Sequence, residues 1–414
     1  MAKDKTTWEI RMPKFSQLKS DLDVDVLIIG GGITGIICAY LLSKEKLKVA
    51  LIEKNRLCSG ATVATTAFLT RIIDTDLRKL VKMYGYSQTE DLIKAHQYAI
   101  DQFENIIKKN KIDCEFMRCP NYSYAIDEKS AMDLIEENRI ARSFGIKTEF
   151  SRSLELGFDN YGYIKIENQA KFHPLKFLSS LAKIAKDNGV MIFENTEAKE
   201  IQDKYKIITN RGEISARKII IATYAPFDNK IYFKKAFYDS YIIEAKIPKG
   251  MIPEGIYEDT MDPYHYFRID PQGKHDRMII GGEDHRSDIP VSDSKSFKGL
   301  KEYINNTFPG MKYKIARKWK GPILETVDGL GYVGPVDNKE IYYATGFSGN
   351  GMTYSMLASK IIVNDVLNEK DKQLIRYAQI YNANRKPNLT SLAHKGVDYS
   401  RELIHGAVKN TLKT

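Results

Sequence analysis

The stretch Asp23-Val-Asp-Val-Leu-Ile-Ile-Gly-Gly-Gly-Ile-Thr-Gly35 decides the fold of this chain. Its apolar run before the glycines is typical of a buried strand, and residues 36–44 continue as a helix that is apolar on most faces. Residues 48–53 form a second apolar run with the length of a strand. A strand, a helix and a strand in this order form one βαβ unit, which predicts a parallel sheet.

The glycines of this stretch match the pattern Gly30-x-Gly32-x-x-Gly35. Gly30 permits a tight turn, Gly32 leaves room for a pyrophosphate, and Gly35 lets the helix pack close to the strand. The start of the helix offers free N–H groups to phosphates, and Glu53 at the end of the next strand would bind ribose hydroxyls. We therefore predict a dinucleotide site, although the pattern does not distinguish FAD from NAD and a glycine-rich turn without a ligand is the alternative.

The composition is that of an ordinary globular chain. Its 414 residues predict two or three domains, and 43% hydrophobic with 28% charged residues exclude a disordered chain. Four cysteines exclude a disulfide scaffold and favour a reducing compartment, so we expect a cytoplasmic protein without a signal peptide. The uncharged residues 26–42 are nearly long enough to cross a membrane, but their glycines favour a strand, a turn and a helix, and no membrane span is expected.

The net charge of +10 is concentrated at the C-terminal end. Residues 376–414 contain seven basic and two acidic residues, which is half of the excess. We expect a basic helical tail there. It is either a solvated surface or a patch for RNA or an acidic partner.

Helical and strand-like patterns alternate along the rest of the chain, so two domains that each collect non-contiguous segments are expected. Helices are predicted at 89–109, 128–144, 174–188, 297–307 and 352–367, and strands at 114–126, 161–166, 197–210, 214–222, 238–247, 264–269, 277–282 and 341–345.

Two segments resemble the FAD-dependent D-amino acid oxidase (DAO) superfamily. Residues 23–56 are similar to its first nucleotide-binding segment, and Tyr342-Tyr-Ala-Thr-Gly-Phe-Ser-Gly-Asn-Gly-Met-Thr353 is similar to its closing motif. In that family the closing turn presents backbone N–H groups to the pyrimidine edge of the flavin. The helix start at Gly351 and Met352 would stabilise negative charge on the reduced flavin. A helix-capping turn without a ligand is the alternative.

The resemblance covers residues 8–367 and is particularly close to the FAD modules of bacterial oxidoreductases that often carry an appended Rieske domain. Segments 58–67, 168–176, 219–223 and 325–334 are similar to that group. Two residues depart from it: Phe68 stands where close relatives often have Lys, and Asn350 where many have His. No Rieske cysteine and histidine pattern follows residue 367, so we expect any such partner to be a separate chain.

The resemblance implies an α/β fold with a glutathione-reductase-like, Rossmann-type FAD-binding domain at 1–90, 168–228 and 325–375. The second, substrate domain, at 91–167 and 229–324, would be built on an antiparallel sheet. Residues 60–66 would lie beside the isoalloxazine ring, and the strand around 196–198 would hold the adenine.

FAD is expected to be bound non-covalently, because no Cys precedes Thr326-Val-Asp328 as it does in covalent relatives. The predicted FAD-binding residues are Gly30, Gly32, Ile33, Thr34, Gly35, Glu53, Lys54, Gly60, Ala61, Thr62, Thr65, Thr66, Ala198, Ala222, Thr223, Gly346, Gly349, Asn350, Gly351, Met352 and Thr353.

Members of the family oxidise a C–N bond of an amine or amino acid by hydride transfer to the flavin N5. Such a site needs a cation or hydroxyl for a substrate carboxylate. In Tyr264-His-Tyr-Phe-Arg268 the alternation of a strand puts Tyr264, Tyr266 and Arg268 on one face, where Arg268 could bind a carboxylate bidentately. A surface Arg with packing tyrosines is the alternative, and Arg71 is the second candidate for the carboxylate.

Three other groups of polar residues are weaker candidates. Cys114 and Cys119 have no second pair nearby, so no metal site is predicted. His173 beside a proline is expected to be structural, and Gly282-Glu-Asp-His285 is a minor candidate for acid–base catalysis.

The expected protein is a FAD-dependent amine or amino-acid dehydrogenase with a separate electron acceptor. Oxygen is expected to be a poor acceptor, because the Lys that sarcosine-type oxidases keep near the flavin N5 aligns with Met278, and Arg277 points to the opposite face. The alternatives are an oxidase that uses oxygen, an RNA-modifying flavoenzyme, and a flavin-binding electron carrier. Nucleic acid is not the expected partner.

Overall fold

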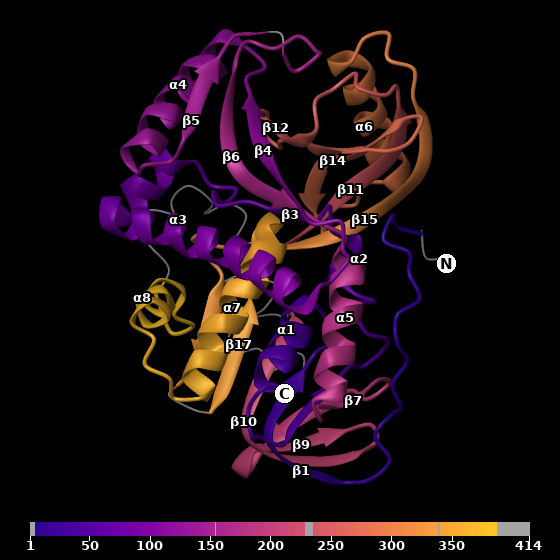
Figure 1. Ribbon diagram of the computed structural model, residues 1–414, viewed down its shortest axis with the longest axis vertical. Coiled ribbons are helices and arrows are strands. Elements are labelled where there is room, and N and C mark those ends of the chain that lie inside the picture. Colours follow the sequence, from indigo (N-terminus) through magenta and orange to yellow (C-terminus); the bar gives the residue numbers. More distant parts are fainter. Residues whose placement is uncertain (1–4, 154, 228–234, 338–339, 387–414) are drawn as a thin grey trace.

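The computed structural model describes residues 5–153, 155–227, 235–337 and 340–386, and their strands form two sheets (Figure 1). The first, eight-stranded sheet contains β1 (Leu22–Ile29), β2 (Val49–Ile52), β7 (Met191–Phe193), β8 (Ala198–Gln202), β9 (Lys206–Thr209), β10 (Gly212–Tyr224), β16 (Tyr332–Pro335) and β17 (Ile341–Thr345). The second, nine-stranded sheet contains β3 (Phe68–Leu69), β4 (Met117–Tyr124), β5 (Thr148–Ser151), β6 (Tyr163–Lys171), β11 (Lys235–Ile247), β12 (Gly255–Asp259), β13 (Tyr266–Pro271), β14 (Asp276–Arg286) and β15 (Lys314–Thr326).

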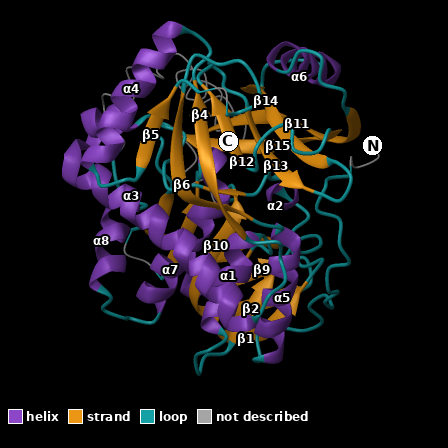
Figure 2. Cartoon of the chain, turned by 45° about the horizontal axis from the view of Figure 1, so that its top comes forward, coloured by secondary structure: helices purple, strands orange, loops and turns teal. Residues whose placement is uncertain are grey.

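The helices lie mainly along one side of the molecule and between the two sheets (Figure 2). α6 stands apart from them, beside β11 and β14. The described helices are α1 (Ile33–Leu42), α2 (Ala61–Ala64), α3 (Leu77–Asn110), α4 (Glu128–Ser143), α5 (Pro174–Asp187), α6 (Asp293–Thr307), α7 (Gly351–Val366) and α8 (Lys372–Tyr381).

The first sheet is built on the predicted βαβ unit, which the structure confirms. β1 lies between β10 and β2 and runs parallel to both. Its apolar side chains are buried on both faces, because the helices of βαβ units cover a parallel sheet. Val26 and Ile28 pack with α1, while Leu27 and Ile29 belong to a separate apolar cluster. α1 also packs against α5 and α7. The Rossmann-type arrangement expected from the sequence is therefore present.

The second sheet is mostly antiparallel, as predicted, and it covers the carboxyl-end region of the first sheet (Figure 1). Its strand order is β15-β11-β14-β13-β12-β4-β6-β3, with β5 pairing β6. β12 was not predicted, because it is short and follows a proline and a glycine. It joins the two halves of this sheet by pairing parallel with β4 and antiparallel with β13.

Several predicted bounds are wrong by a few residues or more. The helix expected at 89–109 begins at Leu77, and a non-helical Gly85 (φ 77°) interrupts it. β13 begins at Tyr266 rather than at residue 264, and β14 continues to Arg286. The long strand β15 was missed, because its first half alternates basic and apolar residues without a buried run.

The two sheets draw on non-contiguous segments of the chain. The domain bounds given above stay a proposal, and they differ from the pairing at three places. The end of β15, residues 325 and 326, was assigned to the FAD-binding domain but pairs with β11 in the second sheet. β3 and the end of β6 were assigned to the FAD-binding domain, whereas both strands pair in the second sheet.

The basic tail is described only as far as residue 386, and most of the predicted segment 376–414 lies outside the described residues. Within the described part, Arg376 forms an ion pair with Asp91 and Arg385 forms one with Asp328. These two basic residues therefore pack against the folded chain. None of the helices in the described ranges has both the length and the apolar character needed to cross a membrane.

Candidate active site

A cavity of about 490 Å³ lies at the carboxyl ends of the parallel strands β1, β2, β10 and β17. Residues from β4, β6, β11 and β12 of the second sheet line it as well. Open α/β sheets bind ligands at this edge, since the loops that follow the strands diverge there. One side of the cavity is therefore formed by the edge of the first sheet where nucleotides bind in such folds, and the opposite side is formed by the second sheet.

The glycine motif at the start of α1 leaves space for a ligand. A Cβ on Gly30, which has φ 112°, would lie 2.5 Å from the carbonyl oxygen of Ala222, and a Cβ on Gly35 would lie 1.9 Å from that of Gly30. A Cβ on Gly32 would meet only Thr62 Oγ1, at 3.2 Å. Gly30 and Gly35 are thus required by the protein itself, while Gly32 faces the cavity.

The N-cap residue of α1, Gly32, has no side chain to cap the helix. The N–H of Ile33 donates to Thr62 Oγ1 at 3.1 Å, and the N–H groups that follow in the first turn are available to a ligand in the cavity. Such a terminus binds phosphate through its N–H groups and its partial positive charge. The cavity end beside it is also lined by Glu197 and Ala198, where the adenine end was predicted.

Glu53 lies at the end of β2 and is held in place by two backbone groups. Its Oε2 accepts a hydrogen bond from Gly31 N at 2.8 Å, and its Oε1 accepts one from Asn55 N at 2.8 Å. Each carboxylate oxygen keeps a further lone pair, so Glu53 can still accept hydroxyl donors from a ribose.

Replacing Glu53 with alanine is expected to weaken FAD binding by about 1–3 kcal/mol, because charge-assisted hydrogen bonds to the ribose are lost. A fluorescence titration of the apoprotein with FAD measures this change. Glu45→Ala, which removes an exposed acid beyond α1, is the matched control and should bind FAD as the parent protein does. Equal affinity for Glu53→Ala and the parent would contradict the assignment.

A second uncapped helix N-terminus opens onto the same cavity. α7 begins at Gly351, where an added Cβ would meet nothing within 4 Å, and the side chain of its N-cap residue Asn350 makes no capping bond. Instead Asn350 accepts from Asp74 N at 3.0 Å and donates to Thr70 Oγ1 at 3.2 Å. It therefore ties the loop around residue 70 to the turn, and the backbone of α7 stays free for a ligand.

These residues fit FAD. α1 would hold the pyrophosphate, Glu53 the ribose, and α7 the pyrimidine edge of the flavin, where reduction adds negative charge. Among the described lining residues Cys58 is the one thiol. Burial, with Glu53 and Glu194 nearby, raises the pKa of Cys58, so this thiol stays protonated and does not favour a covalent link.

Most of the predicted site residues line this one cavity, including Tyr264 and Tyr266. The rings of these two tyrosines lie 5.6 Å apart, and Tyr266 contacts Phe68 edge-to-face at 5.9 Å. Burial raises the pKa of both phenols above the ordinary range, so they are neutral hydrogen-bond donors. Four predicted residues do not line the cavity: Gly35, Arg71, Arg268 and Thr353.

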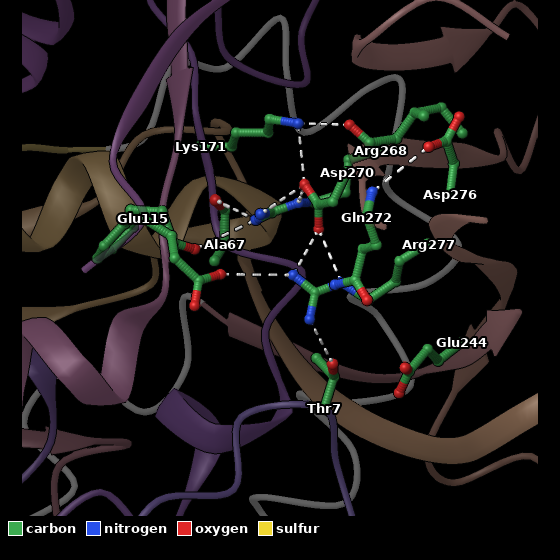
Figure 3. A network of polar contacts seen from close by, with 12 residues as sticks. Thr7, Ala67, Glu115, Lys171, Glu244, Arg268, Asp270, Gln272, Asp276 and Arg277 are labelled. Atoms are coloured by element: carbon green, nitrogen blue, oxygen red, sulfur yellow. Dashed lines mark hydrogen bonds and ion pairs between the residues drawn. The ribbon is translucent and has the colours of Figure 1, made fainter. Parts of the chain in front are cut away.

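Contrary to the prediction, Arg268 does not reach the cavity. Its side chain binds other groups inside the protein (Figure 3). It is 1% exposed and forms an ion pair with Asp270 at 2.9 Å. Its Nη1 donates to the carbonyl oxygens of Thr66, Ala67 and Phe172 at 3.1, 3.3 and 3.2 Å. Arg268 therefore lies behind the lining and holds the loop that carries Thr65 and Thr66.

Asp270 is the centre of this buried network. Lys171 contacts it at 2.9 Å and Arg277 at 2.8 Å, in addition to Arg268 (Figure 3). Although burial opposes ionisation, these three cations lower the pKa of Asp270.

Arg71 is also placed differently from the prediction. Its Nη2 donates to the Glu167 carbonyl oxygen at 2.9 Å, and its backbone N–H donates to Gln169 Oε1 at 2.7 Å. The side chain thus binds β6 rather than facing the cavity. Thr353 is buried behind the lining and accepts from Thr70 N at 3.2 Å.

The weaker candidates lie away from the cavity in the structure. His173 accepts from Lys176 N at 3.3 Å and so caps α5, in line with the structural role predicted for it. His285 contacts the Tyr241 hydroxyl at 3.3 Å and does not line the cavity.

Sequence reasoning missed the polar residues that the second sheet and the loop before α3 contribute. Asn121 and Gln169 come from β4 and β6, Glu258 from β12, and Asp74 from that loop. Asn121 and Glu258 lie on paired strands although they are far apart along the chain. No local pattern could have joined them, because their contact depends on the pairing of β12 with β4.

The family model for DAO, FAD dependent oxidoreductase, matches residues 25–364. The chain is 29% identical to YhfW of Bacillus subtilis (strain 168), whose name describes a Rieske 2Fe-2S iron-sulfur protein, over 96% of this chain and 79% of that protein. It is 24% identical to the gamma-glutamylputrescine oxidoreductase of Escherichia coli (strain K12), with 84% of each chain covered.

Among solved structures, glycine oxidase from Geobacillus kaustophilus shares this fold. Its TM-score is 0.71 at 20% sequence identity, with 84% of this chain and 96% of that chain covered. The family match includes the glycine motif, the second sheet and α7, which together form the cavity described above. The chain therefore belongs to the DAO family of FAD-dependent oxidoreductases, and its cofactor is non-covalently bound FAD.

Proposed function

We propose that this protein oxidises a C–N bond of an amine or amino acid and passes the electrons to an acceptor other than oxygen. The observation that carries the proposal is the meeting of two helix N-termini, those of α1 and α7, with a tyrosine-lined end in one cavity. Relatives named as glycine oxidase, D-amino acid dehydrogenase and gamma-glutamylputrescine oxidoreductase support the substrate class.

The chain's own residues would position the substrate and keep water away from it. Phe68, Tyr264 and Tyr266 form an aromatic wall, and the two phenols can donate hydrogen bonds to a substrate. FAD supplies the two-electron acceptor when it is bound. The substrate carbon loses a hydride, the C–N bond becomes an imine, and water then releases ammonia or an amine from it.

An anaerobic screen of amines and amino acids tests this activity. Purified protein loaded with FAD should lose its flavin absorbance near 450 nm with at least one compound of the substrate class. The loss should take a time on the order of minutes. Heat-denatured protein mixed with the same compounds is the control. If no amine or amino acid bleaches the flavin, the proposed reaction is wrong.

The electron acceptor is proposed from the absence of a cation near the flavin end. Contrary to the sequence alignment, Met278 does not line the cavity but lies in the apolar core of the second sheet, 0% exposed, so it says nothing about charge beside the flavin. Phe68 does line the cavity, where it contacts Tyr266. Arg277 binds Asp270. A fixed positive charge beside the flavin would favour electron transfer to oxygen by stabilising superoxide, and none of the described lining residues at that end supplies one.

Admitting air to the anaerobically reduced protein is expected to reoxidise the flavin over minutes, while an artificial dye supports rapid turnover. Stopped-flow and slow absorbance traces measure the two rates. Reoxidation by air within about a second would instead indicate an oxidase. The name of the YhfW relative makes an iron–sulfur protein the first natural acceptor to test.

We also propose that the protein works in the cytoplasm. Its four cysteines, Cys38, Cys58, Cys114 and Cys119, are free and buried, which suits a reducing compartment. Cell fractionation with an antibody tests this location.

A further inference from the structure

The end of the cavity beneath the second sheet is lined by acidic side chains and not by basic ones. Asp74 and Glu258 line it, together with the neutral polar residues Asn121, Gln169 and Ser240. Lys54 is the one basic residue among the described lining residues, and it follows Glu53 at the opposite, nucleotide end. A substrate carboxylate would therefore find two acids and no cation there.

Glu258 presents one engaged and one free oxygen. Its Oε1 accepts hydrogen bonds from Asn121 Nδ2 at 3.0 Å and from the Ser123 hydroxyl. Within the described part of the chain, its Oε2 has no hydrogen-bond partner. The side chain is thus fixed in orientation by β4, with an acceptor left over on the cavity side of the sheet.

Asn121, whose Nδ2 donates to Glu258, adds a second unused acceptor. It lines the cavity, is 4% exposed, and its Oδ1 has no hydrogen-bond partner among the described residues. A buried carbonyl oxygen without a donor is costly, and a ligand that donates a hydrogen bond would remove that cost.

Asp74 stands on the flavin side of the same space. Its Oδ2 accepts from Gly349 N at 2.9 Å. A Cβ placed on Gly349 would lie 2.7 Å from that oxygen and 3.3 Å from the Tyr264 hydroxyl, so Asp74 and Tyr264 converge beside the closing turn. The exposed surface of Asp74 includes the part that lines the cavity.

We infer that the substrate is a cationic amine whose reacting carbon carries no carboxylate. The inference rests on the proposed function and names the substrate class of that same site. An ammonium group can donate to Glu258 Oε2, Asn121 Oδ1 and Asp74, and the rings of Tyr264 and Tyr266 offer faces to a cation. An α-carboxylate would enter beside two acids and would be repelled by them.

Pairs of compounds that differ by one carboxylate test the inference directly. Each amino acid has a single amine, on the carbon that bears the carboxylate, and the pairs are isobutylamine with valine, isoamylamine with leucine, and tyramine with tyrosine. Single-turnover experiments are run anaerobically with FAD-loaded protein. In at least one pair the amine should bleach the flavin at least about tenfold faster than its amino acid. A tenfold ratio of rates corresponds to a difference of roughly 1.4 kcal/mol in activation free energy. Equal or faster bleaching by the amino acid overturns the inference.

Binding without turnover separates recognition from chemistry. tert-Butylamine has no hydrogen on the carbon beside nitrogen and cannot be oxidised there, and pivalate is its anionic counterpart. Calorimetry should detect tert-butylamine binding to the FAD-loaded protein and little or no binding of pivalate. Preferred binding of pivalate would overturn the inference.

The variant Glu258→Gln removes the charge and retains an oxygen that can accept from Asn121 and Ser123. It should weaken tert-butylamine binding at least about tenfold, without loss of FAD. Glu149→Gln, at an exposed acid on β5, is the matched control. Unchanged binding in Glu258→Gln would show that this acid does not recognise the amine.

The pH dependence of binding is a further readout. Although Asp74 is exposed toward the cavity, the protein that surrounds it and the neighbouring Glu258 raise its pKa to about 7, with smaller effects in the same direction from Glu325 and Asp284, while Gly349 N opposes them. Asp74 is therefore neutral below this value and anionic above it. Alkylamines keep their proton through this range, as lysine does, so their affinity should rise from about pH 6 to about pH 8. Burial also raises the pKa of Glu258, so this acid can contribute to the same rise. Asp74→Asn should flatten the rise, whereas a rise that persists in Asp74→Asn and is lost in Glu258→Gln would assign it to Glu258 and exclude Asp74.

Failure of this inference and failure of the proposed function give different results. If amino acids bleach the flavin and their decarboxylated partners do not, the inference is wrong and the function stands. If neither class bleaches it, the function is wrong, and the tert-butylamine and pivalate titrations still report whether the acid-lined end selects cations.

Discussion

Replacing Gly32 with valine is expected to abolish FAD binding while the protein remains folded. Gly32 has φ −81° and ψ −170°, an extended conformation that valine adopts without strain. Within the protein an added Cβ would meet only Thr62 Oγ1, at 3.2 Å, which a small shift relieves. The branched side chain would instead occupy the space in front of the α1 N-terminus, where the pyrophosphate must approach. We expect an affinity loss of at least about a thousandfold, or ~4 kcal/mol.

Flavin absorbance after purification and a titration with added FAD measure this loss, and circular dichroism reports the fold. Gly35→Val is the informative comparison, because a Cβ there would lie 1.9 Å from the Gly30 carbonyl oxygen. That variant should lose the fold as well as the cofactor. A folded Gly32→Val protein with full flavin occupancy would place the pyrophosphate elsewhere.

Replacing Arg268 with alanine is expected to destabilise the protein by about 3–5 kcal/mol, the usual cost of breaking a buried ion pair. The change removes one of three cations around Asp270 and leaves the carbonyl oxygens of Thr66, Ala67 and Phe172 without their donor. Because Thr66 lines the cavity, the loop that carries it should loosen and FAD affinity should fall too.

Urea unfolding of the apoprotein and of the FAD complex separates these two effects. Arg217→Ala is the matched control, since Arg217 is 83% exposed and its pair with Asp25, at 3.2 Å, lies on the surface. It should change stability by at most about 0.5 kcal/mol. A stable Arg268→Ala protein with normal FAD affinity and a raised substrate KM would restore the carboxylate-binding role predicted from the sequence.

The sequence by itself determined the parts of the protein whose information is local. The strand, turn and helix around Gly30 and Gly35 follow from neighbouring residues, because backbone approach at these positions excludes any Cβ. The closing turn before Gly351 is local in the same way. For this reason nearly all the predicted FAD-binding residues meet at one cavity.

Only the tertiary structure decided what faces the substrate. Strand alternation correctly predicted that Tyr266 faces the cavity. It could not show that the guanidinium of Arg268 binds the Thr66 carbonyl oxygen and the Asp270 carboxylate. Glu258 and Asn121 share a site because β12 enters the sheet beside β4, a pairing between distant segments. Periodicity reports which side of a strand a residue occupies, whereas the charge of a cavity depends on which strands the fold brings together.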